Sequence, residues 1–375
     1  MAYLGEHIPK LGFGLMRLPK KDNEDNEIDV EQTKEMVDIF MDSGFTYFDT
    51  AYGYNEGKSE ETAKAAIVDR YPRDKFLLAT KLPAWAGAKN ADEAKQMFWT
   101  SLKRTGADYF DFYLLHNLGA TRTMKFDDYN IWDYALELKQ KGLVRHVGFS
   151  FHDKASLLDE LLTKHPEMEF VQLQINYADW ESGTVQSRLC YEVARKHNKP
   201  IIVMEPVKGG MLENLAPSVK AVFAEANPSA SCTSWAIRYA ASLDGIITVL
   251  SGMSSLSHMK DNVSYMKDFR PLDDKEQAVI ERAQKALSEL PSVPCTTCEY
   301  CLAECPKNIV IPKILEMLNR EMVYKDLRAA KFGYFWETQF GGKGSDCIEC
   351  GKCEEVCPQQ IKIMALMKDA SSKYE

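Results

Sequence analysis

The segments Phe76-Leu-Leu-Ala-Thr-Lys81 and Phe110-Asp-Phe-Tyr-Leu-Leu-His116 decide the fold of this chain. Each is an apolar run of strand length, and the helical stretch Ala91–Arg104 lies between them. A strand that is apolar on both faces must be covered on both faces, and a helix between two such strands is typical of a parallel βαβ unit. The two segments therefore predict a parallel sheet flanked by helices.

The same alternation of short apolar runs and helical stretches continues through residues 1–290. The strand-like runs are Leu11–Met16, Thr46–Thr50, Phe76–Lys81, Phe110–His116, Arg145–Ser150, Phe170–Asn176, Ile201–Pro206 and Ile246–Ser251. Eight such units in about 250 residues predict a closed (β/α)8 TIM barrel. A doubly wound open sheet is the main competitor, but it normally has a glycine-rich phosphate loop after its first strand, and none follows Leu11–Met16.

Length and composition fit one large barrel domain with a small appendage. The chain has 375 residues, of which 45% are hydrophobic and 27% are charged, as in an ordinary packed protein. Its 55 acidic residues outnumber its 46 basic ones, which argues against a nucleic-acid binder, since such proteins present a basic face to phosphates. With neither a run of about 18 apolar residues nor a signal-like start, we expect no membrane span and a cytoplasmic location.

Ten cysteines stand out, because metal binding is a better expectation than disulfides in a reducing cytoplasm. Eight of them follow Pro291, in two runs of the form C-x2-C-x2-C-x3-C-P: Cys295, Cys298, Cys301 and Cys305, then Cys347, Cys350, Cys353 and Cys357. Bacterial two-cluster ferredoxins bind [4Fe–4S] clusters with this spacing, whereas all-cysteine zinc sites usually come as separated C-x2-C pairs. We therefore predict a barrel over residues 1–290 and a small α+β ferredoxin-like domain with two [4Fe–4S] clusters over 291–375.

The second part resembles the bacterial ferredoxins, in which the fourth cysteine of each run binds the other cluster. The resemblance implies one cluster on Cys295, Cys298, Cys301 and Cys357, and a second on Cys347, Cys350, Cys353 and Cys305. The 41 residues between Cys305 and Cys347 exceed the link in the smallest ferredoxins, and Pro312–Tyr324 is expected to form an inserted helix. The remaining cysteines, Cys190 and Cys232, lie in helical stretches and are expected in the core.

Polar side chains stand at the carboxyl ends of three successive strands of the predicted barrel. They are Asp49, Lys81 and His116, and the carboxyl end of a barrel is the face on which side chains converge into a site. Such groups are costly to bury unless they meet one another. Each alone has a structural explanation, an ion pair for Lys81 or a hydrogen-bonded core position for His116, but together they favour a site.

Residues 8–265 resemble the aldo-keto reductases, whose catalytic Asp-Tyr-Lys-His tetrad matches Asp49, Tyr54, Lys81 and His116. The resemblance implies that Tyr54 is the general acid, because Tyr52 lacks the family's five-residue offset from Asp49. A free phenol has a pKa of about 10, and a neighbouring Lys81 ammonium would lower it. Asp49 would hold Lys81 charged, and His116 would orient the substrate carbonyl by a hydrogen bond.

The resemblance also implies an NAD(P)(H) site at the barrel mouth. The matching positions are Ser150, Gln174, Gly252, Met253 and Asn262. The family's carboxamide-binding Asn is Phe151 here, its stacking aromatic is Met204, and the segment that usually holds the adenosine 2′-phosphate with Lys, Ser and Arg reads Gly252, Met253 and His258. Loss of two cations removes the strongest charge-assisted phosphate contacts.

Three functions fit these features. The first is a nicotinamide-linked reductase of a small-molecule carbonyl, or a dehydrogenase of an alcohol. The second is an electron-transfer module that exchanges electrons with a ferredoxin or flavoprotein, and the third is a non-catalytic binding subunit, which the intact tetrad disfavours. A hydride carries two electrons and a cluster passes one. A flavin could divide the two electrons of a hydride into single electrons, but the sequence carries no signature for a flavin. The sequence also gives no signal for an oligomeric state.

From the altered phosphate segment we predict weak or absent preference for NADP(H) over NAD(H). Titration of the protein with NADH and NADPH measures the two affinities. Much tighter binding of NADPH would contradict this prediction.

Overall fold

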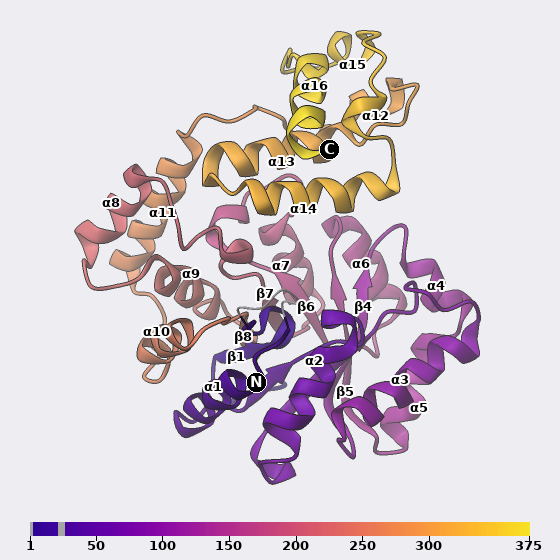
Figure 1. Cartoon of the computed structure of the whole chain (residues 1–375), viewed down its shortest axis with the longest axis vertical. Coiled ribbons are helices and arrows are strands. Elements are labelled where there is room, and N and C mark those ends of the chain that lie inside the picture. Colours follow the sequence, from indigo (N-terminus) through magenta and orange to yellow (C-terminus); the bar gives the residue numbers. More distant parts are fainter. Residues whose placement is uncertain (1–2, 22–26) are drawn as a thin grey trace. The chain divides into compact units, whose positions relative to one another are not determined.

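The computed structural model describes residues 3–21 and 27–375 of the chain. Eight parallel strands close into a barrel in chain order, with β8 paired to β1 (Figure 1). The strands are β1 (Leu11–Gly14), β2 (Tyr47–Asp49), β3 (Leu77–Leu82), β4 (Phe110–Leu118), β5 (Val144–Phe151), β6 (Phe170–Gln174), β7 (Ile201–Met204) and β8 (Ile246–Ser251). The (β/α)8 barrel predicted from the apolar runs is confirmed.

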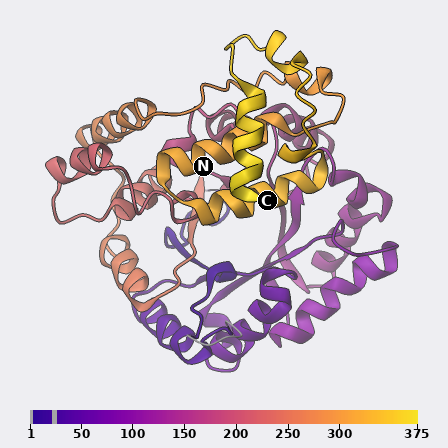
Figure 2. The same ribbon diagram turned by 45° about the horizontal axis from the view of Figure 1, so that its top comes forward.

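Helices surround the ring of strands (Figure 2). Those around the barrel are α1 (Val30–Asp42), α2 (Lys58–Ala63), α3 (Ala91–Thr105), α4 (Thr123–Asp128), α5 (Ile131–Gln140), α6 (Ala155–Lys164), α7 (Ser187–Lys196), α9 (Cys232–Ala241) and α10 (Leu256–Met266). Side-chain caps begin several of them: Asp29 accepts a hydrogen bond from the main-chain N–H of Gln32, and Asn90 accepts one from that of Glu93. Such caps satisfy donors that a helix start leaves free.

The strands are buried on both faces, as their apolar sequences require. On β2, Tyr47 belongs to the cluster inside the barrel, together with Phe112 and Phe170. The next residue, Phe48, belongs to the larger cluster between strands and helices, together with Phe13. Because side chains alternate along a strand, β2 contributes to both cores.

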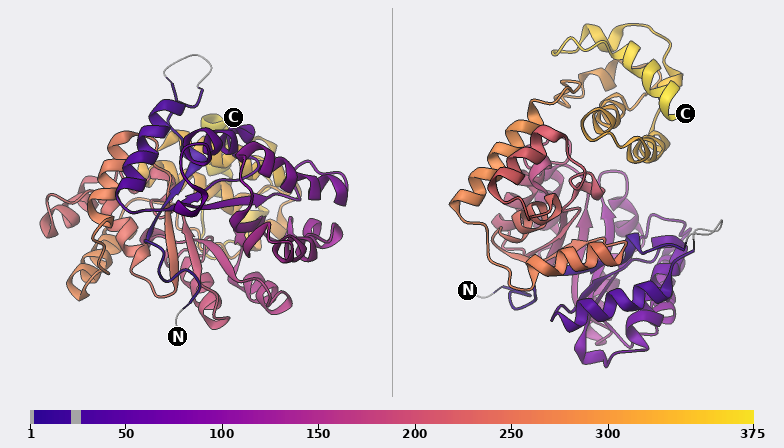
Figure 3. Two further views of the ribbon diagram at one scale, coloured as in Figure 1. Left: turned by 90° about the horizontal axis from the view of Figure 1, so that it is seen from below. Right: turned by 60° about the vertical axis from the view of Figure 1, so that its left-hand side comes forward.

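By its contacts the chain divides into two compact units, Met1–Lys208 with Thr233–Gln277, and Gly209–Cys232 with Ala278–Glu375. The helices of the second unit are α8 (Pro217–Ala226), most of α11 (Asp274–Ser288), α12 (Tyr300–Glu304), α13 (Ile311–Tyr324), α14 (Leu327–Glu337), α15 (Lys352–Glu355) and α16 (Ile363–Tyr374). Helices α13, α14 and α16 pack together around Ile314, Leu318 and Met367 (Figure 3). The domain boundary at residue 290 stays a prediction.

Three smaller features complete the fold. An isolated parallel bridge joins Ile309 and Gly342 in the second unit. Cys190 is buried in α7, as expected, but Cys232 at the start of α9 is only half-buried, so its assignment to the core was wrong. Among the described residues, no helix has the length and apolar character needed to span a membrane.

Candidate functional site

The carboxyl-end rim of the barrel holds a buried ion pair between Asp49 and Lys81. Asp49 ends β2, Lys81 lies near the end of β3, and their side chains are 4% and 0% exposed. Lys81 Nζ donates to Asp49 Oδ1 and also, at 2.8 Å, to the main-chain oxygen of Thr50. Burial lowers the pKa of Lys81, but Asp49 and Tyr54 raise it by more, so the net direction is upward and the ammonium stays charged.

The second carboxylate oxygen of Asp49 is held by a residue that sequence reasoning missed. Gln172 on β6 is 2% exposed, and its Nε2 donates to Asp49 Oδ2 at 3.2 Å. Since Gln172 stands two residues before Gln174 on the same strand, both side chains face the barrel interior. That spacing of two amides in an apolar run was the available signal.

Tyr54 begins the short helical turn η2 (Tyr54–Gly57), directly after the β2 strand and its loop. Lys81 Nζ lies 4.8 Å from the centroid of the Tyr54 ring. The next two residues, Asn55 and Glu56, have left-handed backbone angles of φ 49° and 58°, and such strained positions cluster at functional sites. Asn55 Nδ2 donates to the main-chain oxygen of Met16 at 3.1 Å, which links the turn to the short helical turn η1 (Leu15–Arg17) that follows β1.

The electrostatics of Tyr54 differ from those expected from Lys81 alone. Burial raises the pKa of the Tyr54 phenol; Lys81 lowers it, Asp49 raises it, and the net direction is upward. Lys81 thus acts in the predicted direction but is outweighed by desolvation. The phenol therefore keeps its proton near neutrality, the state in which it can act as an acid. The other phenol, Tyr52, lies against Arg104, whose guanidinium carbon is 4.6 Å from the ring centroid.

His116 completes the group from β4. Its ring centroid lies 5.8 Å from that of Tyr54, with the planes at 78°, and its main-chain oxygen accepts a hydrogen bond from Trp85 Nε1 at 2.8 Å. Burial, with the nearby charges of Lys81, His152 and Arg122, holds the pKa of His116 well below its usual range. The imidazole is therefore neutral near pH 7 and has one N–H to donate.

Two residues predicted to contact a nicotinamide lie on neighbouring strands and offer complementary groups. Ser150 on β5 accepts the main-chain N–H of Asn117 at 2.7 Å, which leaves its own hydroxyl hydrogen to donate. Gln174 ends β6, and its Nε2 donates to Asp179 Oδ2 at 3.3 Å, which leaves its carbonyl oxygen to accept. One donor and one acceptor fit a primary carboxamide, the group that a nicotinamide carries.

The other predicted cofactor positions, Asn262, Met253 and Gly252, differ in what they can offer a ligand. Asn262 on α10 is 2% exposed, and its Oδ1 accepts from Ser251 Oγ at 2.6 Å. The side chain of Met253 is buried in the cluster between strands and helices, so only its main chain is available to a ligand. A side chain at Gly252 would meet Arg17, with its Cβ 3.6 Å from that of Arg17.

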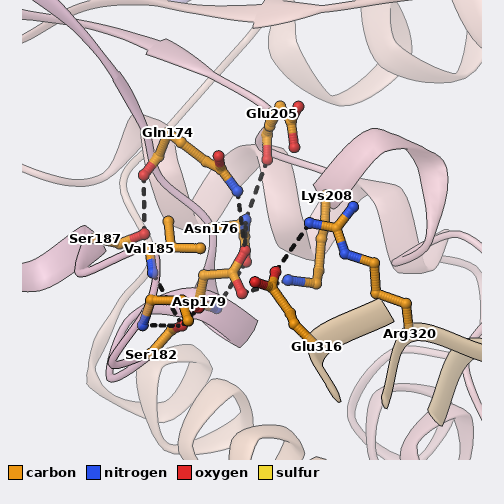
Figure 4. Close-up of polar contacts among 11 residues, drawn as sticks. Gln174, Asn176, Asp179, Ser182, Val185, Ser187, Glu205, Lys208, Glu316 and Arg320 are labelled. Atoms are coloured by element: carbon orange, nitrogen blue, oxygen red, sulfur yellow. Dashed lines mark hydrogen bonds and ion pairs between the residues drawn. The ribbon is translucent and has the colours of Figure 1, made fainter. Parts of the chain in front are cut away.

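A second buried acid–amine pair lies beyond β6 and β7 (Figure 4). Asp179 ends the turn η5 (Tyr177–Asp179), and Lys208 begins the turn η6 (Lys208–Gly210). Their side chains are 6% and 8% exposed, and Lys208 Nζ donates to Asp179 Oδ1. Asn176 Nδ2 donates to Asp179 Oδ2 at 2.8 Å. Sequence reasoning missed Asp179, because it lies in a turn with no recognised spacing.

The eight cysteines of the two C-x2-C-x2-C-x3-C-P runs line two cavities, four to each. One is lined by Cys295, Cys298, Cys301 and Cys357, and the other by Cys305, Cys347, Cys350 and Cys353. Each cavity thus combines three cysteines of one run with the fourth of the other. In the described ranges, no three His, Cys, Asp or Glu side chains are arranged around a single metal ion. Thiols spread around a cavity are the donor set that a polynuclear iron–sulfur cluster takes, with one thiolate for each iron.

The two cysteine runs repeat one backbone conformation. Left-handed angles occur at Thr297 and Glu299 of the first run, and at the equivalent Glu349 and Gly351 of the second. Alternation of right- and left-handed residues turns successive N–H groups toward one point, which makes a concave site for anions. This geometry suits a cluster whose thiolates make it negatively charged.

Comparison with known sequence families matches both parts of the chain. The profile of the aldo/keto reductase family matches residues 10–285, and that of the 4Fe-4S dicluster domain matches residues 294–361. An aldo-keto reductase of Mycobacterium sp. (strain KMS) is 28% identical over 146 residues, which are 39% of this chain and 47% of the relative, so about half of that relative is spanned. The uncharacterized oxidoreductase YqkF of Bacillus subtilis (strain 168) is 24% identical, over 72% of this chain and 92% of the relative.

Solved structures show the same fold. The holo form of the aldo-keto reductase AKR11C1 from Bacillus halodurans has a TM-score of 0.60 and 24% identity, and covers 76% of this chain and 96% of its own. An aldo-keto reductase from Klebsiella pneumoniae in complex with NADPH has a TM-score of 0.59 and 20% identity, and covers 73% and 90%. At these identities the likeness establishes the barrel fold alone.

The buried pair at the rim yields a stability prediction. Replacing Lys81 by Met leaves the Asp49 charge unpaired inside the barrel, and we expect a loss of about 3–5 kcal/mol in the free energy of unfolding. The double variant Asp49→Asn/Lys81→Met removes both charges and should recover most of that loss. Urea unfolding followed by circular dichroism measures both. A double variant as unstable as Lys81→Met would contradict the buried pairing.

Proposed function

Since the chain belongs to the aldo/keto reductase family and carries a 4Fe-4S dicluster domain, we propose that it is a nicotinamide-linked iron–sulfur oxidoreductase. It reduces a small-molecule carbonyl or oxidises the corresponding alcohol. The observation that carries the proposal is the meeting of Lys81 with Asp49, the Tyr54 ring and, beyond that ring, His116. An ammonium, a phenol and an imidazole gathered at the carboxyl-end rim are the groups that carbonyl reduction requires.

In the direction of reduction, each residue of the group has one task. Ser150 and Gln174 would hold the carboxamide of a reduced nicotinamide, which would supply the hydride for the carbonyl carbon. Tyr54 donates its phenolic proton to the carbonyl oxygen, which completes the alcohol and leaves a phenolate. The Lys81 ammonium, 4.8 Å from the ring centroid, stabilises the phenolate as it forms, and Asp49 keeps Lys81 charged. The phenolate then recovers a proton from solvent.

His116 orients the substrate without changing its charge. Since its pKa is held well below the usual range, mainly by burial, it acts as a neutral hydrogen-bond donor to the carbonyl oxygen. Tyr54 and His116 would thus hold one oxygen between two donors. That arrangement positions the carbonyl carbon for hydride transfer and stabilises negative charge that develops on the oxygen.

For the dinucleotide, the supporting observation is the donor–acceptor pair of Ser150 and Gln174 described above. The Klebsiella pneumoniae structure, described in complex with NADPH, supports a nicotinamide dinucleotide as the class of cofactor. The position equivalent to the family's phosphate-binding Lys is Gly252, and its neighbour Met253 turns its side chain into the core. These features support the weak or absent preference for NADP(H) that the sequence predicts.

For the clusters, we propose the crossed ligand sets that the two cavities bring together. One [4Fe–4S] cluster is held by Cys295, Cys298, Cys301 and Cys357, and the other by Cys347, Cys350, Cys353 and Cys305. Held by these cysteines, the clusters would supply single-electron transfer or a docking site for a partner protein.

A second candidate function is an electron-transfer module that serves a ferredoxin or a flavoprotein. It is favoured by apolar side chains exposed beside the cluster cysteines, Tyr300 at 61% and Ile348 at 57%, since exposed apolar groups often mark protein contacts. Reduction of the clusters by NADH or by reduced substrate, seen by electron paramagnetic resonance, would support this function over a barrel that works alone.

The general-acid role is tested by removing one hydroxyl group. Tyr54→Phe is expected to lower kcat for aldehyde reduction by about 10²- to 10⁴-fold, because the proton donor is lost, with dinucleotide affinity nearly unchanged. Oxidation of NADH or NADPH by aldehydes, followed at 340 nm, gives kcat. Tyr52→Phe is the matched control and should keep most activity. Equal activity of Tyr54→Phe and the wild-type protein would refute the role.

Crossed ligation is tested by pairs of cysteine substitutions. Cys298→Ser/Cys357→Ser alters two ligands of one proposed cluster and should leave about four irons per chain, since the other cluster stays intact. Cys298→Ser/Cys305→Ser alters one ligand of each cluster and should impair both. Iron and sulfide analysis of protein purified without air measures the difference. The reverse pattern would show that each run holds its own cluster.

A further inference from the structure

We infer that Asp179, with Lys208 as its counter-ion, is a positioning residue that fixes the amide orientation of Gln174. This makes the barrel rim selective for a primary carboxamide. The inference rests on the proposed dinucleotide site and deepens it. Neither Asp179 nor Lys208 belongs to the Asp49, Tyr54, Lys81 and His116 group, and the pair lies on the turns after β6 and β7 instead.

The contacts around Asp179 leave it little freedom. Its Oδ1 accepts from Lys208 Nζ, and its Oδ2 accepts from Asn176 Nδ2 at 2.8 Å and from Gln174 Nε2 at 3.3 Å (Figure 4). Its main-chain N–H donates to Asn176 Oδ1 at 2.8 Å. Asn176 is fully buried and also donates to the main-chain oxygen of Glu205 at 3.3 Å. Asp179 is therefore held on both carboxylate oxygens and by its main chain.

The orientation of Gln174 follows from the chemistry of a carboxylate. An ionised carboxylate only accepts hydrogen bonds, so the amide atom that faces Asp179 has to be the nitrogen. The carbonyl oxygen Oε1 of Gln174 then becomes the atom presented to a ligand, and in the described part of the chain it makes no hydrogen bond. If Asp179 were neutral and able to donate, either amide orientation would be allowed.

The fixed acceptor matters because of what Ser150 offers on the neighbouring strand. Ser150 accepts from Asn117 and so has a hydroxyl hydrogen to donate, and Gln174 lies two residues beyond the register partner of Ser150 on β6. A primary carboxamide has one carbonyl oxygen and one NH₂ group, and it satisfies both partners at once. A carboxylate bound in the same place would put one of its oxygens against Oε1 of Gln174. Both atoms are acceptors, so no hydrogen bond could form and the carboxylate would be rejected.

Lys208 allows Asp179 to remain ionised while buried. A carboxylate that is 6% exposed is costly to ionise without a close cation. Lys208 has a left-handed φ of 50°, and Glu205, whose main-chain oxygen accepts the main-chain N–H of Lys208 at 2.9 Å, has a φ of 53°. Non-glycine residues persist in this conformation where the surrounding contacts hold them. The ion pair, together with the hydrogen bond from Asn176 Nδ2 to the main-chain oxygen of Glu205, links this segment to η5.

The test separates a role in orienting the amide from a general structural role. In the double variant Asp179→Asn/Lys208→Met both charges are lost with little change in shape, so no buried charge is left unpaired. Isothermal titration calorimetry compares the dinucleotide that binds the wild-type protein better with the matching ADP-ribose or 2′-phospho-ADP-ribose, which lacks the nicotinamide. We expect the Kd of the dinucleotide to rise about tenfold and that of the ADP-ribose to stay within about twofold.

A second variant keeps the inference falsifiable if the first does not fold. Gln174→Leu removes the acceptor itself and should give the same selective loss, and adding it to the double variant should cause no further loss. Equal losses for both ligands, or no loss for the dinucleotide in Gln174→Leu, would overturn the inference while leaving the proposed function intact. A wild-type protein that binds neither dinucleotide would overturn the proposed cofactor and the inference together.

Discussion

The ion pair between Asp49 and Lys81 is the interaction on which the rim of this barrel depends. A lysine and an aspartate at the ends of apolar strands are tolerable only when each satisfies the other, and the parallel pairing of β2 with β3 brings the two side by side. Gln172 reaches the same carboxylate from β6. The charge on Lys81 lowers the pKa of Tyr54 against the larger effect of burial, and it adds to the effect of burial in lowering the pKa of His116.

The same physical solution occurs twice at the carboxyl end of the sheet. Asp179 and Lys208 form a second buried pair. In our proposal this pair orients the side-chain amide of Gln174, whereas Asp49 and Lys81 lie beside the phenol of Tyr54. A buried ion pair adds little to stability, but it sets the orientation of the groups that surround it. The loops of the two cysteine cavities instead repeat left-handed backbone positions, as at Thr297 and Glu349.

The sequence was sufficient for features that follow from a period or a spacing. Apolar runs predicted the eight strands, and the doubled cysteine spacing predicted the dicluster domain that the family comparison finds. The sequence was insufficient where a property, such as a pKa, depends on opposing contributions from burial and from neighbouring charges in the folded structure. The pKa of Tyr54 moves upward because burial exceeds the effect of Lys81. Gln172 and Asp179 act through partners far away in the chain, Asp49 and Lys208, and the sequence does not show those pairings.

The most direct measurement of the central claim is the protonation state of Lys81 itself. Selective ¹³Cε and ¹⁵Nζ labelling of lysine allows its nuclear magnetic resonance signal to be followed with pH, and Lys81→Met identifies the signal by its loss. Because Asp49 raises the pKa of Lys81 above the ordinary lysine value of about 10.4, the signal should keep its ammonium position at least to about pH 10. A neutral amine at pH 7 would contradict the account.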